Sequence, residues 1–314
     1  MKKALNHYAL LIIILGFIIT ITSCKHTPQK KETVKNHKNL TKPKNNAAQQ
    51  SLSKAFKGYW YAGEAEISSY KLEQARYGEI RQGNAILIYV TEDFLPKAQV
   101  KADSQNPNNT SVLKLNTTKS FNTGIYPYSI MQSTFYPVLN NQHALKVSVS
   151  MQEWCGHSYM QLNNKNNFDI TLHSYFEGEE DQNITVKKSI LENELWTQVR
   201  INPKSLPTGI LEIIPSFEYF RLKHIDIKAY KANAKLTNNT YTIQYPNLNR
   251  TLVIHFTPDF PHKILGWEET FKSGFGSKAK NLTTKATLLK TIKSDYWNKK
   301  MKIHKNLRDT LQLN

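Results

Sequence analysis

The chain has 314 residues, a formal net charge of +18 and two cysteines. The charge sits at the two ends, because residues 25–57 carry nine Lys against one acidic residue (net +8) and residues 278–308 carry ten basic residues against Asp295 (net +9). Residues 58–277 hold 21 basic and 21 acidic side chains. A basic face with interleaved aromatic residues is therefore not expected, and nucleic acid is excluded as a predicted partner.

The N-terminus has the order of a secretory signal. Lys2 and Lys3 precede an apolar run from residue 8 to residue 21, which ends in Thr22, Ser23 and Cys24. The run is shorter than the roughly 20 residues that a membrane-spanning helix needs. Residues 21–24 resemble the lipobox of bacterial lipoproteins, which implies cleavage after residue 23 and lipid on the Cys24 thiol. The alternative is an ordinary signal peptide with an incidental cysteine at its end.

Residues around the cleavage site indicate where the mature protein resides. Lys25 stands where an inner-membrane retention signal usually has Asp, and resemblance to known sorting rules implies the outer membrane. No acidic run of the kind that marks surface display follows Cys24, which favours the periplasmic face. Membrane lipid is thus a predicted partner through the acyl chains on Cys24, with about 0.8 kcal/mol for each buried methylene.

Residues 24–57 are expected to form a flexible basic stalk, because they are rich in Lys, Asn, Gln and Thr and contain few large apolar groups. The stalk is either solvated or held near anionic head groups, at about 1 kcal/mol per Lys. Once Cys24 is lipidated, Cys155 is the last free thiol, so no intramolecular disulfide is expected. Residues 58–277 are long enough for one β-rich globular domain.

From residue 58 onward the sequence predicts β-structure. Short runs rich in Ile, Val, Thr, Tyr and Phe alternate with Asn, Gly and Pro clusters, and short links favour antiparallel pairing. Within 143–151 apolar and polar residues alternate, as in a sheet with one wet face. We expect a curved, incompletely closed antiparallel sheet with strands near 63–75, 79–92, 111–121, 128–138, 143–154, 157–163, 167–176, 209–221, 225–236, 240–245, 250–256 and 264–272.

One helix is predicted near 189–199, with Ser189 as its N-cap and Glu192 completing a capping box. Its apolar stripe runs through Ile190, Leu191, Leu195 and Val199. The remaining segment, 278–314, is a basic C-terminal extension. We expect residues 282–297 to form a last strand or a helix, and their Thr-rich sequence favours the strand. A tail follows.

Several stretches in the middle of the chain resemble an uncharacterised family of outer-membrane lipoproteins, some of which are labelled septum formation inhibitor Maf. The similarity covers roughly residues 58–297. Maf nucleotide pyrophosphatases carry a Ser-x-Ser-Pro-x-Arg loop that this chain lacks, so that activity is not expected here. The stretches that carry the resemblance are 73–81 (EQARYGEIR), 91–94 (TEDF), 152–157 (QEWCGH), 174–178 (SYFEG) and 267–269 (WEE).

The turn at residues 78–83 gives a second resemblance, to periplasmic domains built as a curled, incompletely closed sheet. Lipoprotein carriers of that shape hold acyl chains in the hollow. The resemblance implies a lipoprotein-carrier-like half barrel and a lipid or other apolar ligand, although shared fold alone does not establish function.

Cys155, His157 and Glu153 are the weak candidates for catalysis, because a nucleophile needs a base and an orienting acid. Alternate positions on one strand lie about 6 to 7 Å apart, too far for a thiol–imidazole bond without a kink at Gly156. A small structural thiol beside a bulge is the favoured interpretation.

The candidates for ligand binding lie mainly on the first hairpin, where they either converge or form a structural salt-bridge network. Trp154 belongs to a set of aromatic residues dense enough to line a hollow, although core packing explains most of that set equally well. No spacing typical of a metal site is present, and no cofactor is predicted. The hairpin candidates are Arg76, Glu79, Arg81, Glu92 and Asp93.

These observations favour a non-enzymatic lipoprotein that binds a lipid or hydrophobic ligand or acts as an envelope scaffold. A deep apolar hollow would support that function. The first alternative is a hydrolase or transferase of the cell envelope that uses Cys155 and His157. The second is an accessory subunit for a membrane protein, which would show a broad exposed apolar patch.

Overall fold

The computed structural model describes residues 52–139 and 142–313, which belong to one compact unit that spans residues 47–314. Cys24, the expected signal peptide and the stalk up to residue 51 lie outside the described residues. The lipid anchor and the stalk up to residue 51 therefore stay predictions, whereas residues 54–57, expected in the flexible stalk, begin a helix in which Phe56 is buried.

The described residues form one mainly antiparallel sheet of 16 strands, which confirms the predicted fold class. Most strands pair with the next strand in the chain through a hairpin turn. Their bounds are β1 (Ala65–Arg76), β2 (Glu79–Leu95), β3 (Val100–Lys101), β4 (Thr110–Thr123), β5 (Tyr126–Pro137), β6 (Lys146–Glu153), β7 (Gly156–Asn164), β8 (Phe168–Ser174), β9 (Gln182–Val186), β10 (Ile190–Leu191), β11 (Gly209–Ile214), β12 (Tyr230–Leu236), β13 (Thr240–Tyr245), β14 (Arg250–Phe256), β15 (Ile264–Ser273) and β16 (Lys280–Ser294).

The sheet stays open between β9 and β10, although these two edge strands follow one another in the chain. The strand order runs from β10 through β16, then β1, β2 and β4, and on to β9, with β3 beside β2. Residues 187–189 alone separate the two edges. Since consecutive Cα atoms are 3.8 Å apart, Val186 and Ile190 lie within about 15 Å of each other. The sheet therefore curls round until its edges nearly meet.

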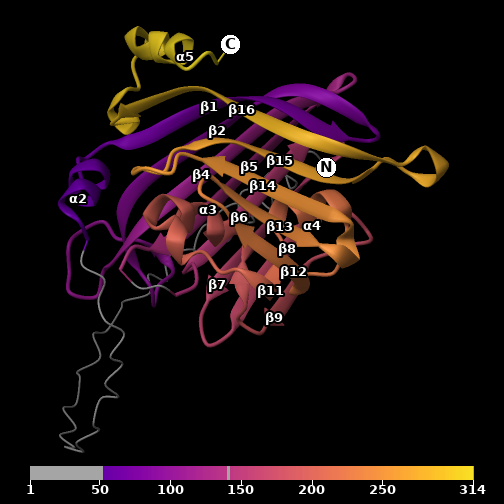
Figure 1. The fold of residues 1–314 in the computed structure, drawn as a ribbon, viewed down its shortest axis with the longest axis horizontal. Helices are drawn as coiled ribbons and strands as arrows, with labels where there is room; N and C mark the ends of the chain where they lie inside the picture. Colours follow the sequence, from indigo (N-terminus) through magenta and orange to yellow (C-terminus); the bar gives the residue numbers. More distant parts are fainter. Residues whose placement is uncertain (1–51, 140–141, 314) are drawn as a thin grey trace, which may run out of the picture. The chain divides into compact units, whose positions relative to one another are not determined.

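Strands β1 and β16 lie in the middle of the sheet (Figure 1). Ala65 of β1 pairs with Ser294 of β16, so the first and last long strands join the two halves of the sheet. The segment 282–297, which the sequence left open between strand and helix, is thus mostly β-strand. After β16 the chain folds back, and Leu311 and Leu313 pack against Ala65.

Side-chain alternation sets the face that each strand buries. In β6, Val147, Val149 and Met151 are buried, while the polar residues between them are half-buried. This confirms the expected alternation over 146–151, because side chains of a strand alternate between its two faces. Leu145 lies before the strand and is half-buried.

The described residues contain four helices, α2 (Lys54–Trp60), α3 (Glu192–Ile201), α4 (Phe217–Lys223) and α5 (Asn306–Thr310). The one predicted helix is α3, but it begins at Glu192. Ser189 does not cap it, because its hydroxyl donates to the carbonyl oxygen of Glu212. The carboxylate of Glu194 accepts from the backbone N–H of Leu191 instead.

The strand predicted at 209–221 is wrong in its second half. Strand β11 ends at Ile214, and residues 217–223 form helix α4. Ser216 follows Pro215, and its hydroxyl accepts from the N–H of Tyr219, as an N-cap does. Figure 1 shows α3 and α4 lying against the sheet. Each helix follows an edge or near-edge strand, so the chain places both at the open side.

A buried ion pair joins α3 to β1. Both nitrogens at the end of the Arg200 side chain bind the carboxylate of Glu66, at 2.6 and 2.7 Å, and both side chains are 1% exposed. Tyr59 donates a further hydrogen bond to Glu66. Burial raises the pKa of Glu66, but the charge and hydrogen bonds of Arg200 outweigh burial and hold this pKa below its ordinary value.

Replacing Glu66 by Gln is expected to lower the free energy of unfolding by about 3–5 kcal/mol at pH 7, because Arg200 would stay buried without its counter-charge. A carboxyl whose pKa is lowered by folding stabilises the protein above its unfolded pKa, and this contribution is lost as pH falls through the folded pKa. The deficit of the variant should therefore shrink below about pH 4.5, the ordinary value. Urea unfolding at several pH values measures it.

The matched control is Glu79→Gln, since Glu79 pairs with Arg81 on the surface. It is expected to change the free energy of unfolding by less than about 1 kcal/mol. Equal losses in the two variants would contradict a special role for the buried pair.

Candidate functional site

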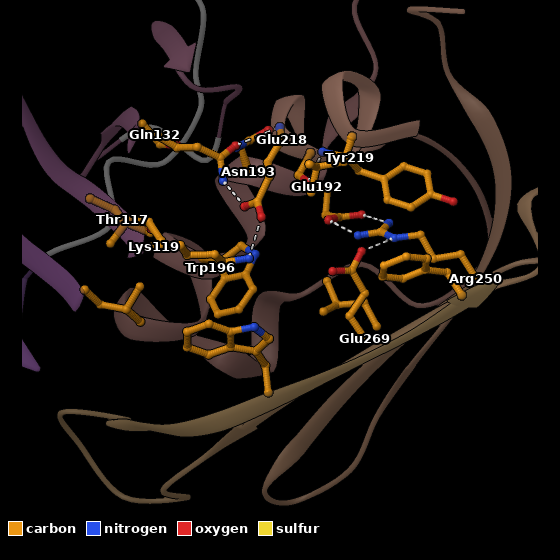
Figure 2. Close-up of a pocket in the computed structure, with 18 residues that line it drawn as sticks. Thr117, Lys119, Gln132, Glu192, Asn193, Trp196, Glu218, Tyr219, Arg250 and Glu269 are labelled. Atoms are coloured by element: carbon orange, nitrogen blue, oxygen red, sulfur yellow. Dashed lines mark hydrogen bonds and ion pairs between the residues drawn. The ribbon is translucent and has the colours of Figure 1, made fainter. Parts of the chain in front are cut away.

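Helices α3 and α4 cover a small hollow on the inner face of the sheet, and its lining mixes charged and polar side chains with leucine and aromatic side chains (Figure 2). Lys119 of β4 and Gln132 of β5 point toward Glu218 of α4. Lys119 Nζ lies 2.8 Å from Glu218 Oε1, and Gln132 Nε2 lies 3.1 Å from Oε2. Asn193 of α3 donates to the amide oxygen of Gln132. Burial raises the pKa of Glu218 above its ordinary value, with the charge of Lys119 opposing it.

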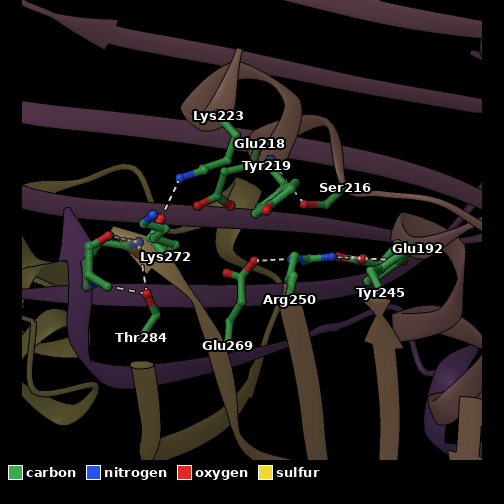
Figure 3. Close-up of polar contacts among 12 residues, drawn as sticks. Glu192, Ser216, Glu218, Tyr219, Lys223, Tyr245, Arg250, Glu269, Lys272 and Thr284 are labelled. Carbon is green, nitrogen blue, oxygen red and sulfur yellow. Dashed lines mark hydrogen bonds and ion pairs between the residues drawn. The ribbon is translucent and has the colours of Figure 1, made fainter. Parts of the chain in front are cut away.

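A second charged cluster lies on the other side of the hollow (Figure 3). Arg250 of β14 binds Glu192 of α3 and, through Nε at 2.6 Å, Glu269 of β15. Tyr245 donates a hydrogen bond to Glu192 at 2.7 Å. Because these contacts come from the strands opposite β4 and β5, α3 is bonded to both halves of the sheet.

The hollow beneath the helices has room for about 40 Å³. A water molecule needs roughly 10–15 Å³ by this measure, so about three or four waters would fill it. An acyl chain does not fit while α3 and α4 are in place. The hollow is therefore a closely packed contact between the helices and the sheet, and the expected deep apolar cavity is not present there.

A larger cleft of about 170 Å³ lies at the open edge of the sheet, next to β9. Six apolar side chains line it, from β7, β8, β9, the end of α4 and the segment that follows α4. At one side Glu179 accepts from Arg221 at 3.4 Å and lies 2.7 Å from His224 Nδ1. The apolar lining residues are Met160, Leu172, Ile184, Phe220, Ile225 and Ile227.

The charged candidates of the first hairpin do not meet at one place. Arg81 pairs with Glu79 at 2.6 Å near the turn. Glu92 pairs with Lys114 of β4 at 2.5 Å. Glu79 and Glu92 are 13 residues apart on one strand, which is about 43 Å. The charges therefore form local ion pairs, in agreement with the structural interpretation.

Asp93 and Arg76 also lie apart from each other. Asp93 accepts from the side-chain amide of Asn109 at 3.4 Å. Arg76 stands at the end of β1 and donates to Leu222, Tyr77 and Tyr128. Arg76 lines a pocket near the ends of β1, α4 and β15.

Trp154 and Cys155 form the two-residue turn between β6 and β7, because Glu153 pairs with Gly156. The indole of Trp154 is 67% exposed and lies 6.4 Å from the ring of Tyr126. It therefore does not line the hollow. Its neighbour Cys155 is exposed as well.

Within the described residues the thiol of Cys155 makes no hydrogen bond to His157, and the backbone N–H of Cys155 donates to the carboxylate of Glu153. A hydrogen bond to Glu153, and the charge of that carboxylate, raise the pKa of the Cys155 thiol. A catalytic cysteine needs the opposite shift, since the thiolate is the nucleophile. The geometry thus gives no support to the Cys155–His157 pair.

Within residues 52–139 and 142–313, no three His, Cys, Asp or Glu side chains gather as metal ligands would. In the same part of the chain no helix is long and apolar enough to cross a membrane.

Sequence reasoning identified Arg76 but missed the cleft and the charged clusters. Glu218 and Arg221 fall in a segment that was predicted as a strand, and Ser216 as a possible N-cap was the available signal. Arg250 stands at the start of an otherwise apolar strand, and such a lone charge is a signal for a buried partner.

Comparison with known proteins leaves the family open. No protein-family model and no curated protein matches the chain. Among solved structures, the chain is similar to a porin-like protein from Bacteroides uniformis ATCC 8492, with 10% identity, a TM-score of 0.21, and coverage of 72% of this chain and 96% of that chain. A TM-score of this size does not establish a shared fold.

Replacing Arg250 by Met is expected to cost about 3–5 kcal/mol of unfolding free energy, because Glu192 would be left buried without its counter-charge. The amides of α3 should also exchange hydrogen faster, since the helix loses its bond to β14. Urea unfolding and hydrogen exchange measure the two effects. Lys285→Met is the control, as Lys285 pairs with Glu268 at 3.8 Å on the exposed surface. Unchanged exchange in α3 would contradict the role given to Arg250.

Proposed function

We propose that this protein is an outer-membrane lipoprotein, held on the periplasmic face by lipid on Cys24, that binds the hydrocarbon part of a lipid or another apolar ligand. The observation that carries the proposal is the cleft at the open edge of the sheet, where six apolar side chains stand beside the charged Glu179, Arg221 and Asp226. The lipobox-like residues 21–24 and the resemblance to a family of outer-membrane lipoproteins support the location.

The size of the cleft suits a small apolar group. Its volume of about 170 Å³ is comparable to the roughly 150 Å³ of a cavity that binds benzene in another protein. A ring or the end of an acyl chain would therefore fit. Burial of such a group contributes roughly 25 cal/mol for each Å² of apolar surface removed from water.

The position of the cleft favours entry from the side. In the described part of the sheet, β9 pairs only with β8, so its outer edge is not covered by another strand. Ile184 of β9 and Ile227 after α4 are half-buried, and both line the cleft. A ligand can reach these side chains without displacing α3.

A second candidate function, an accessory subunit for a membrane protein, is favoured by one observation. Several hairpin tips at the same end of the sheet carry exposed apolar side chains. The ring of Tyr77 lies 5.9 Å from that of Phe275, and the ring of Tyr126 lies 6.4 Å from that of Trp154. Exposed apolar surface of this kind marks interaction sites. The tip residues are Tyr77, Ile125, Trp154, Tyr175 and Phe275.

Replacing Ile227 by Trp is expected to fill the cleft and to weaken binding of a fluorescent fatty acid at least about tenfold, equivalent to 1.4 kcal/mol. Titration of the full chain with the fatty acid measures this. The matched control is Ile210→Trp, because Ile210 is 73% exposed on β11. If the wild-type chain bound no fatty acid, or if both variants bound as the wild type does, the cleft would not be the binding site.

The location has its own test. Radiolabelled palmitate fed to the producing cells should label the wild-type protein, and Cys24→Ala should remove the label. The labelled protein is expected in the outer-membrane fraction. A wild-type protein without label would disprove the lipid anchor and leave the question of the cleft untouched.

A further inference from the structure

A separate pocket of about 150 Å³ lies where the end of β1, the end of α4 and the end of β15 come together. Three basic side chains and a hydroxyl line it, and none of its lining residues is acidic. These polar lining residues are Arg76, Lys223, His224 and Ser273, with Tyr77 and Phe275 as aromatic neighbours.

The two permanent cations of this pocket have no carboxylate partner of their own. Arg76 donates to the carbonyl oxygen of Leu222 at 2.9 Å and to the hydroxyls of Tyr77 and Tyr128 at 3.0 Å, all neutral groups. Lys223 donates to the carbonyl oxygen of Lys272 at 2.7 Å, as Figure 3 shows. Burial lowers the pKa of Lys223, and the nearby charge of Arg76 lowers it further.

The carboxylates nearby are bound to other groups. Glu179 contacts Arg221 and His224, and Glu269 contacts Arg250. No carboxylate contacts Arg76 or Lys223 in the described structure, and the charge of Glu269 offsets that of Lys223 only in part. An anion entering the pocket would relieve the repulsion between these two side chains.

The donors in the pocket are held in place before any ligand arrives. The guanidinium of Arg76 lies over the ring of Tyr77, 4.1 Å from the ring centre. Arginine has five N–H donors, and three of its hydrogen bonds here are described, so further donors remain. The hydroxyl of Ser273 accepts from the backbone N–H of Gly78 and keeps its own hydrogen for an acceptor.

We propose that this pocket binds a phosphate group, supplied either by a lipid head group or by a free phosphate. Arginine and lysine together suit phosphate because arginine binds two oxygens side by side and lysine adds a point charge. The pocket has room for a group of this size, and the exposed Phe275 and Tyr77 at its mouth suit an amphiphile whose apolar part continues outward. The proposal does not depend on ligand binding in the cleft at the open edge of the sheet.

Isothermal titration calorimetry of the full chain at low salt tests the proposal with three probes. These are inorganic phosphate, dihexanoyl phosphatidylglycerol and dihexanoyl phosphatidylcholine. We expect at least one of the two anionic probes to bind, and Arg76→Gln and Lys223→Met each to weaken that binding tenfold or more. Arg81→Gln is the matched control, because it removes one charge from the same hairpin at an exposed ion pair. Urea midpoints identify any variant that fails to fold, and Lys223→Met keeps the test valid if Arg76→Gln does.

Tighter binding of phosphatidylglycerol than of phosphate would assign the site to lipid head groups. Equal affinity for the two would assign it to the phosphate group alone. If neither anionic probe bound the wild-type protein, or if Arg81→Gln lost as much affinity as Arg76→Gln, the proposal would be overturned. Loss of fatty acid binding in Ile227→Trp with intact phosphate binding would show that the two sites are separate.

Discussion

Charged side chains of α3 hold the two halves of the curled sheet to one helix. Arg200 binds Glu66 of β1, and Glu192 binds Arg250 of β14. Glu194 accepts from the backbone N–H of Ala144, just before β6. Each of these groups is buried, so each would be costly without its partner. Because the partners come from strands far apart in the sheet, the helix cannot leave the hollow without breaking all three contacts.

The occupied hollow decides where a ligand can bind. With α3 and α4 in place, the space beneath them is small and lined by both charged and apolar side chains, and the larger cleft lies at the open edge beside β9. The sheet is open there because β9 and β10 do not pair, although residues 187–189 alone join them.

Helix α4 contributes to both proposed sites. Phe220 and Arg221 face the cleft at β9, Lys223 faces the pocket near Arg76, and His224, which caps the helix in a left-handed conformation, lines both. Neighbouring positions on a helix point in different directions, so a helix of seven residues can serve two pockets. An amphiphile with an apolar and an anionic part has a matching surface on each side of α4.

The sequence by itself determined the curved antiparallel sheet, the helix at α3 and the wet and dry faces of β6, because strand alternation and turn residues are local properties. Arg76 also stood out from the sequence. Only the tertiary structure decided that Glu92 lies far from Arg76, that Arg250 meets Glu192, and that α3 and α4 fill the hollow. The ion pairs of α3 join residues that are far apart in the sequence. Glu66 and Arg200, for example, are 134 positions apart. No local pattern encodes which distant strand a buried charge will face, since that depends on how the whole sheet curls.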